Sequence, residues 1–223
     1  MNSTSPLPVV LAITGASGSA YAVRLMQVLL QQENPVHLII SDAAREVARR
    51  ELNSDFPAND AAPEIWLDFL NQVLLTGRAS GWGFATNHIS ESCRLFVHTQ
   101  KNYSAGIASG SFLTRGMVIC PCSMGTLSSI ACGASTNLIQ RAADVHLKER
   151  RTLVLVPRET PLGLIALQNM TTLTTAGATI MPAAPGLYHQ PTTLADIVDF
   201  VVARICDHLK IPHSLMNRWG TDD

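Results

Sequence analysis

Charged side chains are scarce in this sequence. They make up 15% of its 223 residues, against roughly 25% in ordinary soluble domains. The 16 Lys and Arg nearly balance the 17 Asp and Glu, and the formal net charge of −1 excludes a protein that binds nucleic acid or an anionic membrane through its overall charge. Because 47% of the residues are hydrophobic, a monomer would expose much apolar surface. We therefore predict a homo-oligomer.

Long apolar runs, disulfide patterns and metal motifs are also absent. The first apolar run, 9–13, is far shorter than the ~18 residues of a membrane span, and no basic leader precedes it. The five cysteines lack the spacing of a disulfide framework, which predicts reduced thiols and a cytoplasmic location. The histidines show no paired metal-ligand spacing and no Asp-rich stretch occurs, so we expect no metal site.

Short apolar runs alternate with segments of helical period along the chain. We predict strands at 9–13, 36–40, 95–97, 117–120, 153–156 and 179–181, and helices at about 19–30, 43–52, 65–74, 124–131, 137–149, 164–176 and 193–209. This order predicts a three-layer, Rossmann-like α/β fold with a parallel sheet and helices on both faces. We expect one domain over 1–223, with a tail at 1–7 and a variable region at 53–100.

Small and hydroxylated residues follow several of the predicted strands. In an open parallel sheet, ligands bind beyond the carboxyl ends of the strands. The loops 14–18 and 123–126 occupy such positions, and each opens a helix whose free amides suit a phosphate group. Two facing helix N-termini predict a site for a phosphorylated, nucleotide-like cofactor. A tight turn that needs glycine only for its geometry is an equally good explanation of the first loop alone.

Candidate cations lie on two predicted helices. Arg141 and Lys148 are seven residues apart and share a face, although pairing with Asp144 is the simpler explanation from spacing. Arg204 lies in an otherwise apolar stretch, so we expect it to be buried and to need an anion. Asp199, Asp207 or an anionic ligand would each satisfy it.

Glu51 and Tyr188 have simple structural explanations when taken alone. Glu51 stands near the end of a predicted helix beside Arg49 and Arg50, which is typical of a surface carboxylate. Tyr188 lies in a proline-bounded loop, where an aromatic ring commonly packs against the core.

Six motifs taken together nevertheless resemble one family, the flavin prenyltransferases. These are the small partners of the prenylated-flavin-dependent decarboxylases of ubiquinone biosynthesis and aromatic-acid metabolism. The motifs are TGASG at 14–18, ASGS at 108–111, CPCSMGTL at 120–127, NLIQRAADV at 137–145, LVPRETP at 155–161 and PAAPGLYH at 182–189.

The resemblance implies a transferase that uses reduced FMN as a substrate. Such enzymes join the dimethylallyl group of dimethylallyl monophosphate to N5 and then C6 of the flavin and release phosphate without a metal. It also implies a dodecamer and a product that a separate decarboxylase uses.

The resemblance assigns roles to residues by position. The residues that it implies for FMN are Gly15, Ala16, Ser17, Ser41, Ser123, Met124, Gly125, Thr126, Arg141 and Arg158. The residues that it implies for the prenyl phosphate are Tyr103, Lys148, Arg158, Glu159, Tyr188 and Arg204. Tyr103 stands where some members have Trp. Ser17, Glu51 and Glu159 are the implied catalytic residues, with Ser17 and Glu51 handling protons. We also expect Met124, Leu127 and Leu187 to form a dry apolar wall.

Two other functions remain open at this point. An FMN-dependent cysteine decarboxylase of the same fold would need a catalytic His early in the chain, but His37 lies inside a predicted strand. That family's Pro-x-Met-Asn clamp is replaced here by PAAP at 182–185. A non-catalytic flavin carrier is the other alternative, although a carrier has no use for a second phosphate site.

Overall fold

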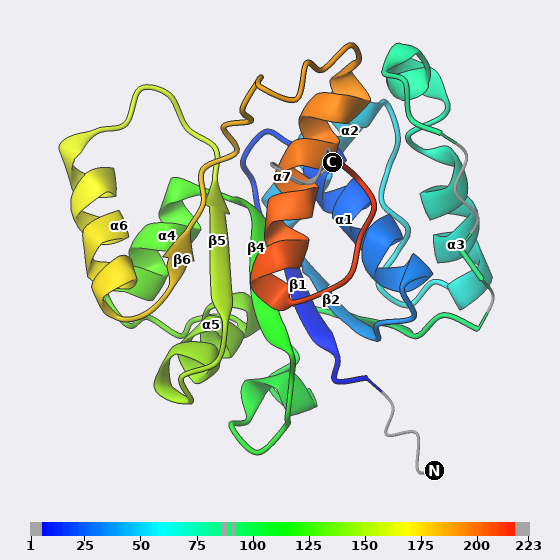
Figure 1. The fold of residues 1–223 in the computed structure, drawn as a ribbon. Coiled ribbons are helices and arrows are strands. Elements are labelled where there is room, and N and C mark those ends of the chain that lie inside the picture. The colour runs from blue at the N-terminus through cyan, green and yellow to red at the C-terminus, as the bar shows by residue number, and fades with distance from the viewer. Residues whose placement is uncertain (1–5, 86–88, 91, 217–223) are drawn as a thin grey trace.

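The computed structural model describes residues 6–85, 89, 90 and 92–216, which build a parallel sheet covered by helices on both faces (Figure 1). The six strands are β1 (Val9–Ile13), β2 (Val36–Ile40), β3 (Leu95–His98), β4 (Gly116–Cys122), β5 (Leu153–Pro157) and β6 (Thr179–Ile180). Every neighbouring pair runs parallel. The predicted α/β fold is confirmed.

Seven α-helices within the described residues connect and cover the strands. They are α1 (Ser19–Gln31), α2 (Asp42–Leu52), α3 (Pro63–Gln72), α4 (Met124–Ala131), α5 (Leu138–Lys148), α6 (Leu164–Thr175) and α7 (Leu194–Leu209). Two short 3-10 helices, η1 (Gly77–Gly81) and η2 (Gly106–Ala108), were not predicted, because their small residues carry no periodic apolar signal. Most of the predicted tail at 1–7 lies outside the described residues.

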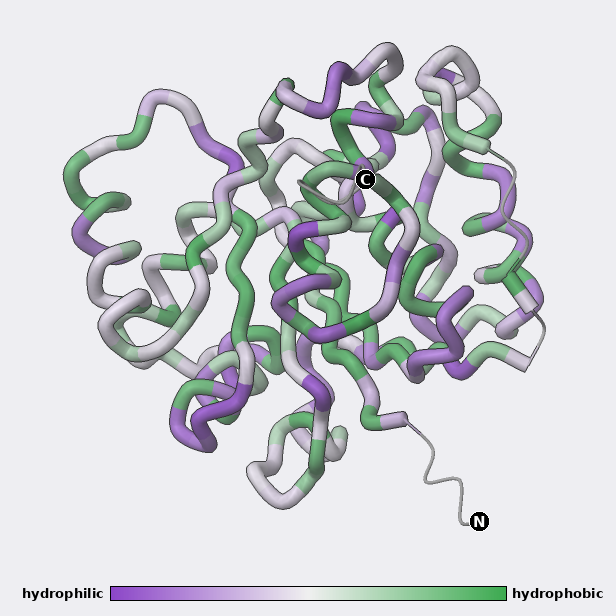
Figure 2. Tube along the Cα trace, viewed as in Figure 1, coloured by the Kyte–Doolittle hydropathy of each residue, from purple (hydrophilic) through white to green (hydrophobic). Residues whose placement is uncertain are grey.

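The strands are apolar on both faces, and each face has its own core. Val9, Leu11 and Ile13 pack with α1, α2, α3 and α7, whereas Val10 and Ala12 pack with α4, α5 and α6. Successive side chains of a strand point to opposite faces, so a run of five apolar residues serves both layers. Figure 2 shows the resulting hydrophobic centre of the molecule.

The direction in which the chain adds strands reverses at the middle of the sheet. The spatial order is β3-β2-β1-β4-β5-β6, so the first three strands build outward from β1 and the last three outward from β4. The loops that follow β1 and β4 therefore lead to helices on opposite faces of the sheet. Open α/β sheets bind ligands at such a switch point, which we call the crevice. This reversal places the two small-residue loops side by side at the carboxyl edge of the sheet.

The described part of the chain holds neither a helix able to span a membrane nor a cluster of potential metal ligands. None of its helices combines the length and apolarity needed to cross a membrane. Within the same residues, no three His, Cys, Asp or Glu side chains are grouped as potential metal ligands.

Candidate functional site

The loop after β4 forms one side of the crevice. Ser123 is the N-cap of α4, and its hydroxyl oxygen accepts a hydrogen bond from the Thr126 amide at 3.3 Å. A Cβ atom added to Gly125 would meet no atom within 4 Å, so this residue borders open space. The first turn of a helix offers amides without intrahelical partners, and at Gly125 a ligand can approach them closely.

The glycine of the first loop serves packing instead. A Cβ atom on Gly15 would come within 2.6 Å of the Ala43 Cβ atom, because the loop after β1 presses against the start of α2. Ser41 caps that helix by accepting a hydrogen bond from the Ala44 amide at 3.1 Å. The structural explanation of Gly15 is thus supported, whereas the Cβ position of Gly125 borders open space at the start of α4.

The start of α1 is occupied by a carboxylate of the same chain. The Glu51 oxygens accept hydrogen bonds from the Gly18 amide at 3.0 and 3.1 Å and from the Ser19 amide at 2.8 Å. Two expectations were wrong here. Glu51 is half-buried and not a simple surface carboxylate, and the Gly18 and Ser19 amides at the start of α1 are not free to bind a phosphate, because Glu51 already accepts from both.

The surroundings of Glu51 keep it ionised. Burial raises the pKa of its carboxyl group, but hydrogen bonds from the Ser17 hydroxyl and from the amides and hydroxyl at the start of α1 outweigh burial and hold the pKa below the ordinary 4.5. The structure therefore brings Ser17 and Glu51 into direct contact. A carboxylate that hydrogen-bonds a serine hydroxyl at the edge of a crevice is suited to proton transfer.

Removing the Glu51 carboxylate should destabilise the start of α1. We expect Glu51→Ala to lower the free energy of unfolding by about 1–2 kcal/mol, as the loss of a helix cap does. The control is Glu46→Ala, which removes an exposed carboxylate of the same helix, paired with Arg49. Denaturant unfolding at neutral pH would show the difference, and equal effects of the two substitutions would contradict this account of Glu51.

The same contact predicts a pH dependence. A carboxyl group whose pKa is lower in the folded than in the unfolded protein stabilises the fold above its unfolded pKa. This stabilisation disappears as the pH falls from about 4.5 through the lower folded pKa. The stability difference between the parent and Glu51→Ala should therefore shrink below pH 4.5 in unfolding measurements at several pH values. A difference that grows in acid would contradict it.

Arg158 joins the same cluster from β5. It follows the last residue of that strand, and its Nε donates a hydrogen bond to the Ser17 carbonyl oxygen at 3.3 Å. Glu159 beside it is exposed and accepts a hydrogen bond from the Thr160 amide at 3.0 Å. One chain thus assembles Ser17, Glu51 and Arg158 at the carboxyl edge of the sheet.

The loop that carries Tyr188 begins next to this cluster. The Ala183 amide donates to the Pro157 carbonyl oxygen at 3.0 Å, which places the start of the loop beside the end of β5. The Tyr188 ring is exposed and meets Phe200 of α7 edge-on, with 5.7 Å between the ring centroids. Leu187 is 67% exposed. The expected apolar wall is therefore incomplete in one chain, where only Leu127 of the expected residues is fully buried.

Lys148 lies near the amino ends of the strands, opposite the crevice. It ends α5 just before β5 begins, whereas Arg158 follows the other end of that strand. Its ammonium group pairs with the neighbouring Glu149 and not with Asp144. The expectation that Lys148 and Arg158 converge is therefore wrong within one chain, because β5 separates them.

Arg204 is exposed and also lies towards the amino ends of the strands. Its guanidinium donates to the Asp207 carboxylate at 2.9 Å, and the end of α7 reaches Gly116, the first residue of β4. The expectation of a buried Arg204 was wrong because it shares the outer helix face with His208. The buried cation near α7 is Arg24 of α1, which no sequence argument had identified. It forms two hydrogen bonds with Asp199, at 2.6 and 3.0 Å.

The remaining predicted residues make contacts within the chain. Arg141 donates to Asp144 at 2.9 Å, as its spacing predicted, and to the Ala108 carbonyl oxygen at 3.0 Å. The exposed Tyr103 donates its hydroxyl to the Ser135 carbonyl oxygen at 3.3 Å. Neither contact reaches the loops at the crevice.

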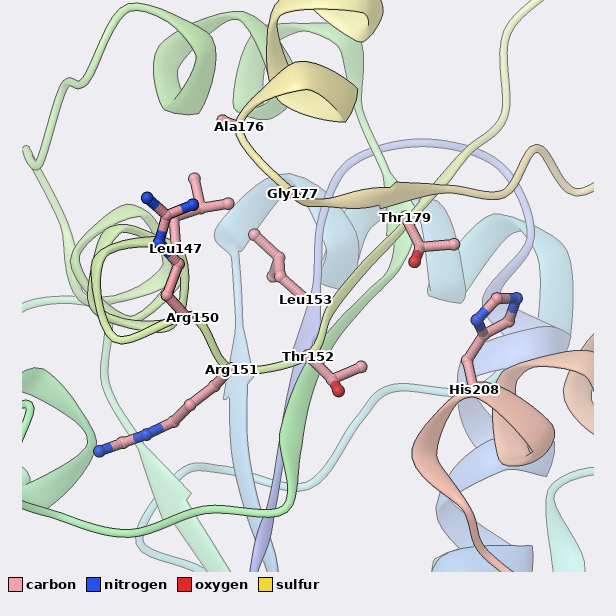
Figure 3. Close-up of a pocket in the computed structure, with 9 residues that line it drawn as sticks. All are labelled: Leu147, Arg150, Arg151, Thr152, Leu153, Ala176, Gly177, Thr179 and His208. Atoms are coloured by element: carbon pink, nitrogen blue, oxygen red, sulfur yellow. The ribbon is translucent and has the colours of Figure 1, made fainter.

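A separate pocket of about 330 Å³ opens at the amino edge of β5 and β6 (Figure 3). Its basic lining residues are Arg150, Arg151 and His208. The Arg151 side chain extends away from the pocket and donates to the carbonyl oxygens of Gly110 and Phe112. No residue predicted for FMN or the prenyl phosphate lines this pocket.

Known proteins share both the sequence and the architecture. Residues 2–206 match the family model described as Flavoprotein. The flavin prenyltransferase UbiX of Pseudomonas aeruginosa is 48% identical over 97% of this chain and 96% of its own.

Two crystal structures extend the comparison. AnUbiX, solved in complex with FMN and dimethylallyl pyrophosphate, is 32% identical with a TM-score of 0.77, covering 98% of this chain and all of its own. A dodecameric FMN-dependent UbiX-like decarboxylase of Escherichia coli is 35% identical with a TM-score of 0.75, covering 96% and 99%. With such identity over nearly the whole length and this crevice at the strand ends, the chain belongs to the flavin prenyltransferase family of transferases.

Proposed function

We propose that this protein transfers the dimethylallyl group of dimethylallyl monophosphate to N5 and C6 of reduced FMN, forming prenylated FMN and phosphate without a metal. Support comes from one arrangement above all. Ser17, Glu51 and Arg158 meet at the strand ends, beside the open space at Gly125. AnUbiX, a relative of the same fold, was solved with FMN and dimethylallyl pyrophosphate.

The crevice has the properties that a bound FMN requires. The residues proposed to hold it are Gly15, Ala16, Ser17, Ser41, Ser123, Met124, Gly125, Thr126 and Arg158 of one chain, with Arg141 from a neighbouring copy. The first turn of α4 offers amides to an anionic group, and the missing side chain at Gly125 leaves room for it. When bound in its reduced form, FMN would supply an electron-rich ring able to accept the allyl group.

The residues around the crevice must manage charge and protons. Breaking the allylic C–O bond leaves negative charge on the departing phosphate, which Arg158 and the Tyr188 hydroxyl would stabilise through hydrogen bonds. Glu51 is held ionised and contacts the Ser17 hydroxyl, so this pair would handle the proton lost from C6. Glu159 and Tyr103 are proposed to line the prenyl side.

Neighbouring copies of the chain are proposed to complete the site. Lys148 and Arg204 lie too far along α5 and α7 to join Arg158 in the same chain. Apolar side chains of α6 are uncovered, with Leu164 and Ile165 each 69% exposed. Burial of that face in a dodecamer, the assembly of the E. coli relative, would bring cations from other copies to the crevice. This protein would act in the cytoplasm, and a separate decarboxylase would use the product.

A reconstituted reaction tests this proposal. Anaerobic reduced FMN and dimethylallyl monophosphate should give a flavin heavier by one C₅H₈ unit in mass spectrometry, together with free phosphate. EDTA should not slow it, and dimethylallyl pyrophosphate in a parallel arm defines the preferred donor. Heat-denatured protein is the control. Absence of the heavier flavin with either donor would contradict the proposed activity.

A further inference from the structure

We infer that Thr14 is a positioning residue that joins the two loops of the FMN site, an inference that rests on the function proposed above. Thr14 follows β1 and is 1% exposed. Its hydroxyl donates to the Pro121 carbonyl oxygen at 2.9 Å and accepts a hydrogen bond from the Ser123 amide at 2.8 Å. The Thr14 amide donates to the same Pro121 oxygen at 3.2 Å. One buried side chain thus ties the loop after β1 to the loop after β4.

The buried position of Thr14 requires a hydroxyl group. It donates and accepts at one atom, so it satisfies a buried carbonyl and a buried amide together. Valine has nearly the same shape but neither capacity. It would leave the Ser123 amide without its partner, while the Pro121 oxygen would keep only the hydrogen bond from the amide of residue 14. The strand reversal makes the contact necessary, because the loops after β1 and β4 diverge from adjacent strands.

The Thr14 hydroxyl also determines which amides of α4 face a ligand. It takes the amide of Ser123, and the Ser123 hydroxyl takes the amide of Thr126. The amides of Met124 and Gly125 lie between these two, in the first turn, where the helix itself supplies no acceptor. Thr14 therefore holds that pair of amides in register with the Ser17 loop, although it would not itself touch FMN.

Substitutions of Thr14 distinguish a role in FMN binding from a general contribution to the stability of the fold. We expect Thr14→Val to weaken FMN binding about tenfold or more and to raise KM for FMN, while Thr14→Ser retains the parental values. The matched control is Thr114→Val, which removes another buried hydroxyl, bonded to His146 Nε2 at 2.8 Å and remote from the crevice.

Two measurements show whether the effect is specific. FMN titration followed by flavin fluorescence gives the affinity, and thermal unfolding with and without saturating FMN gives the stabilisation by FMN. Both valine variants should unfold at lower temperature without FMN, but only Thr14→Val should lose much of the FMN-induced shift. If Thr14→Val is insoluble, Thr14→Ala against Thr14→Ser makes the same comparison.

The outcomes separate this inference from the proposed function. Parental FMN affinity and FMN-induced shift in the valine or alanine variant would overturn the role of Thr14 while leaving prenyl transfer intact. Equal losses in Thr14→Ser and Thr14→Val would overturn it too, because the hydroxyl would not be the cause. A parental protein that binds FMN but yields no prenylated flavin would instead contradict the proposed function.

Discussion

Arg158→Gln is expected to lower kcat/KM for prenyl transfer by about 10²–10³-fold, the usual cost of removing one preorganised donor to a developing negative charge. Arg158 is positioned by the end of β5 and by its hydrogen bond to the Ser17 carbonyl oxygen, so its charge is directed to the crevice. Glutamine keeps a polar, hydrogen-bonding end but removes the positive charge and shortens the side chain. Steady-state kinetics with varied dimethylallyl monophosphate would measure the loss.

A matched arginine provides the control for this experiment. Arg150 is exposed and lines the pocket at the amino ends of the strands (Figure 3). Arg150→Gln therefore removes one positive charge at the amino end of β5, away from the crevice. It should leave the rate unchanged. Arg158→Lys should recover only part of the activity, because an ammonium group lacks the forked geometry of guanidinium. A parental rate in Arg158→Gln would mean that other cations hold the leaving phosphate.

Gly125→Val is expected to abolish most FMN binding without weakening the fold. The added side chain would enter the open space beside the first turn of α4, where no protein atom lies within 4 Å of the Cβ position. We therefore expect the added side chain to collide with a bound ligand rather than with the protein. We expect FMN affinity to fall about 100-fold, the equivalent of roughly 3 kcal/mol, while the unfolding midpoint of the FMN-free protein stays near the parental value.

Two other glycines provide comparison variants for Gly125→Val. Gly81 of η1 also has nothing within 4 Å of its Cβ position, and Gly81→Val should change neither stability nor FMN affinity. Gly15→Val should instead destabilise the protein itself, because its Cβ atom would lie 2.6 Å from the Ala43 Cβ atom. Calorimetric titration with FMN and thermal unfolding distinguish the three cases. Unchanged FMN affinity in Gly125→Val would place the flavin elsewhere.

The fold could be predicted because its strands are short, continuous apolar runs, which is the pattern of a strand covered on both faces of the sheet. Val9–Ile13, Val36–Ile40 and Leu153–Pro157 have this pattern, and the helices between them show clear periodicity. The 3-10 helices escaped prediction because Gly77–Gly81 and Gly106–Ala108 contain mostly small residues.

The motifs of the sequence determined the family and the two loops at the strand ends. Tertiary structure alone decided what Glu51 does, because its partners at the start of α1 lie 32 and 33 positions away and depend on how α2 crosses that helix. It also decided that Lys148 and Arg204 stand apart from Arg158. Spacing along a helix shows which residues share a face. Only the packed structure shows whether those residues lie near the amino or the carboxyl ends of the strands.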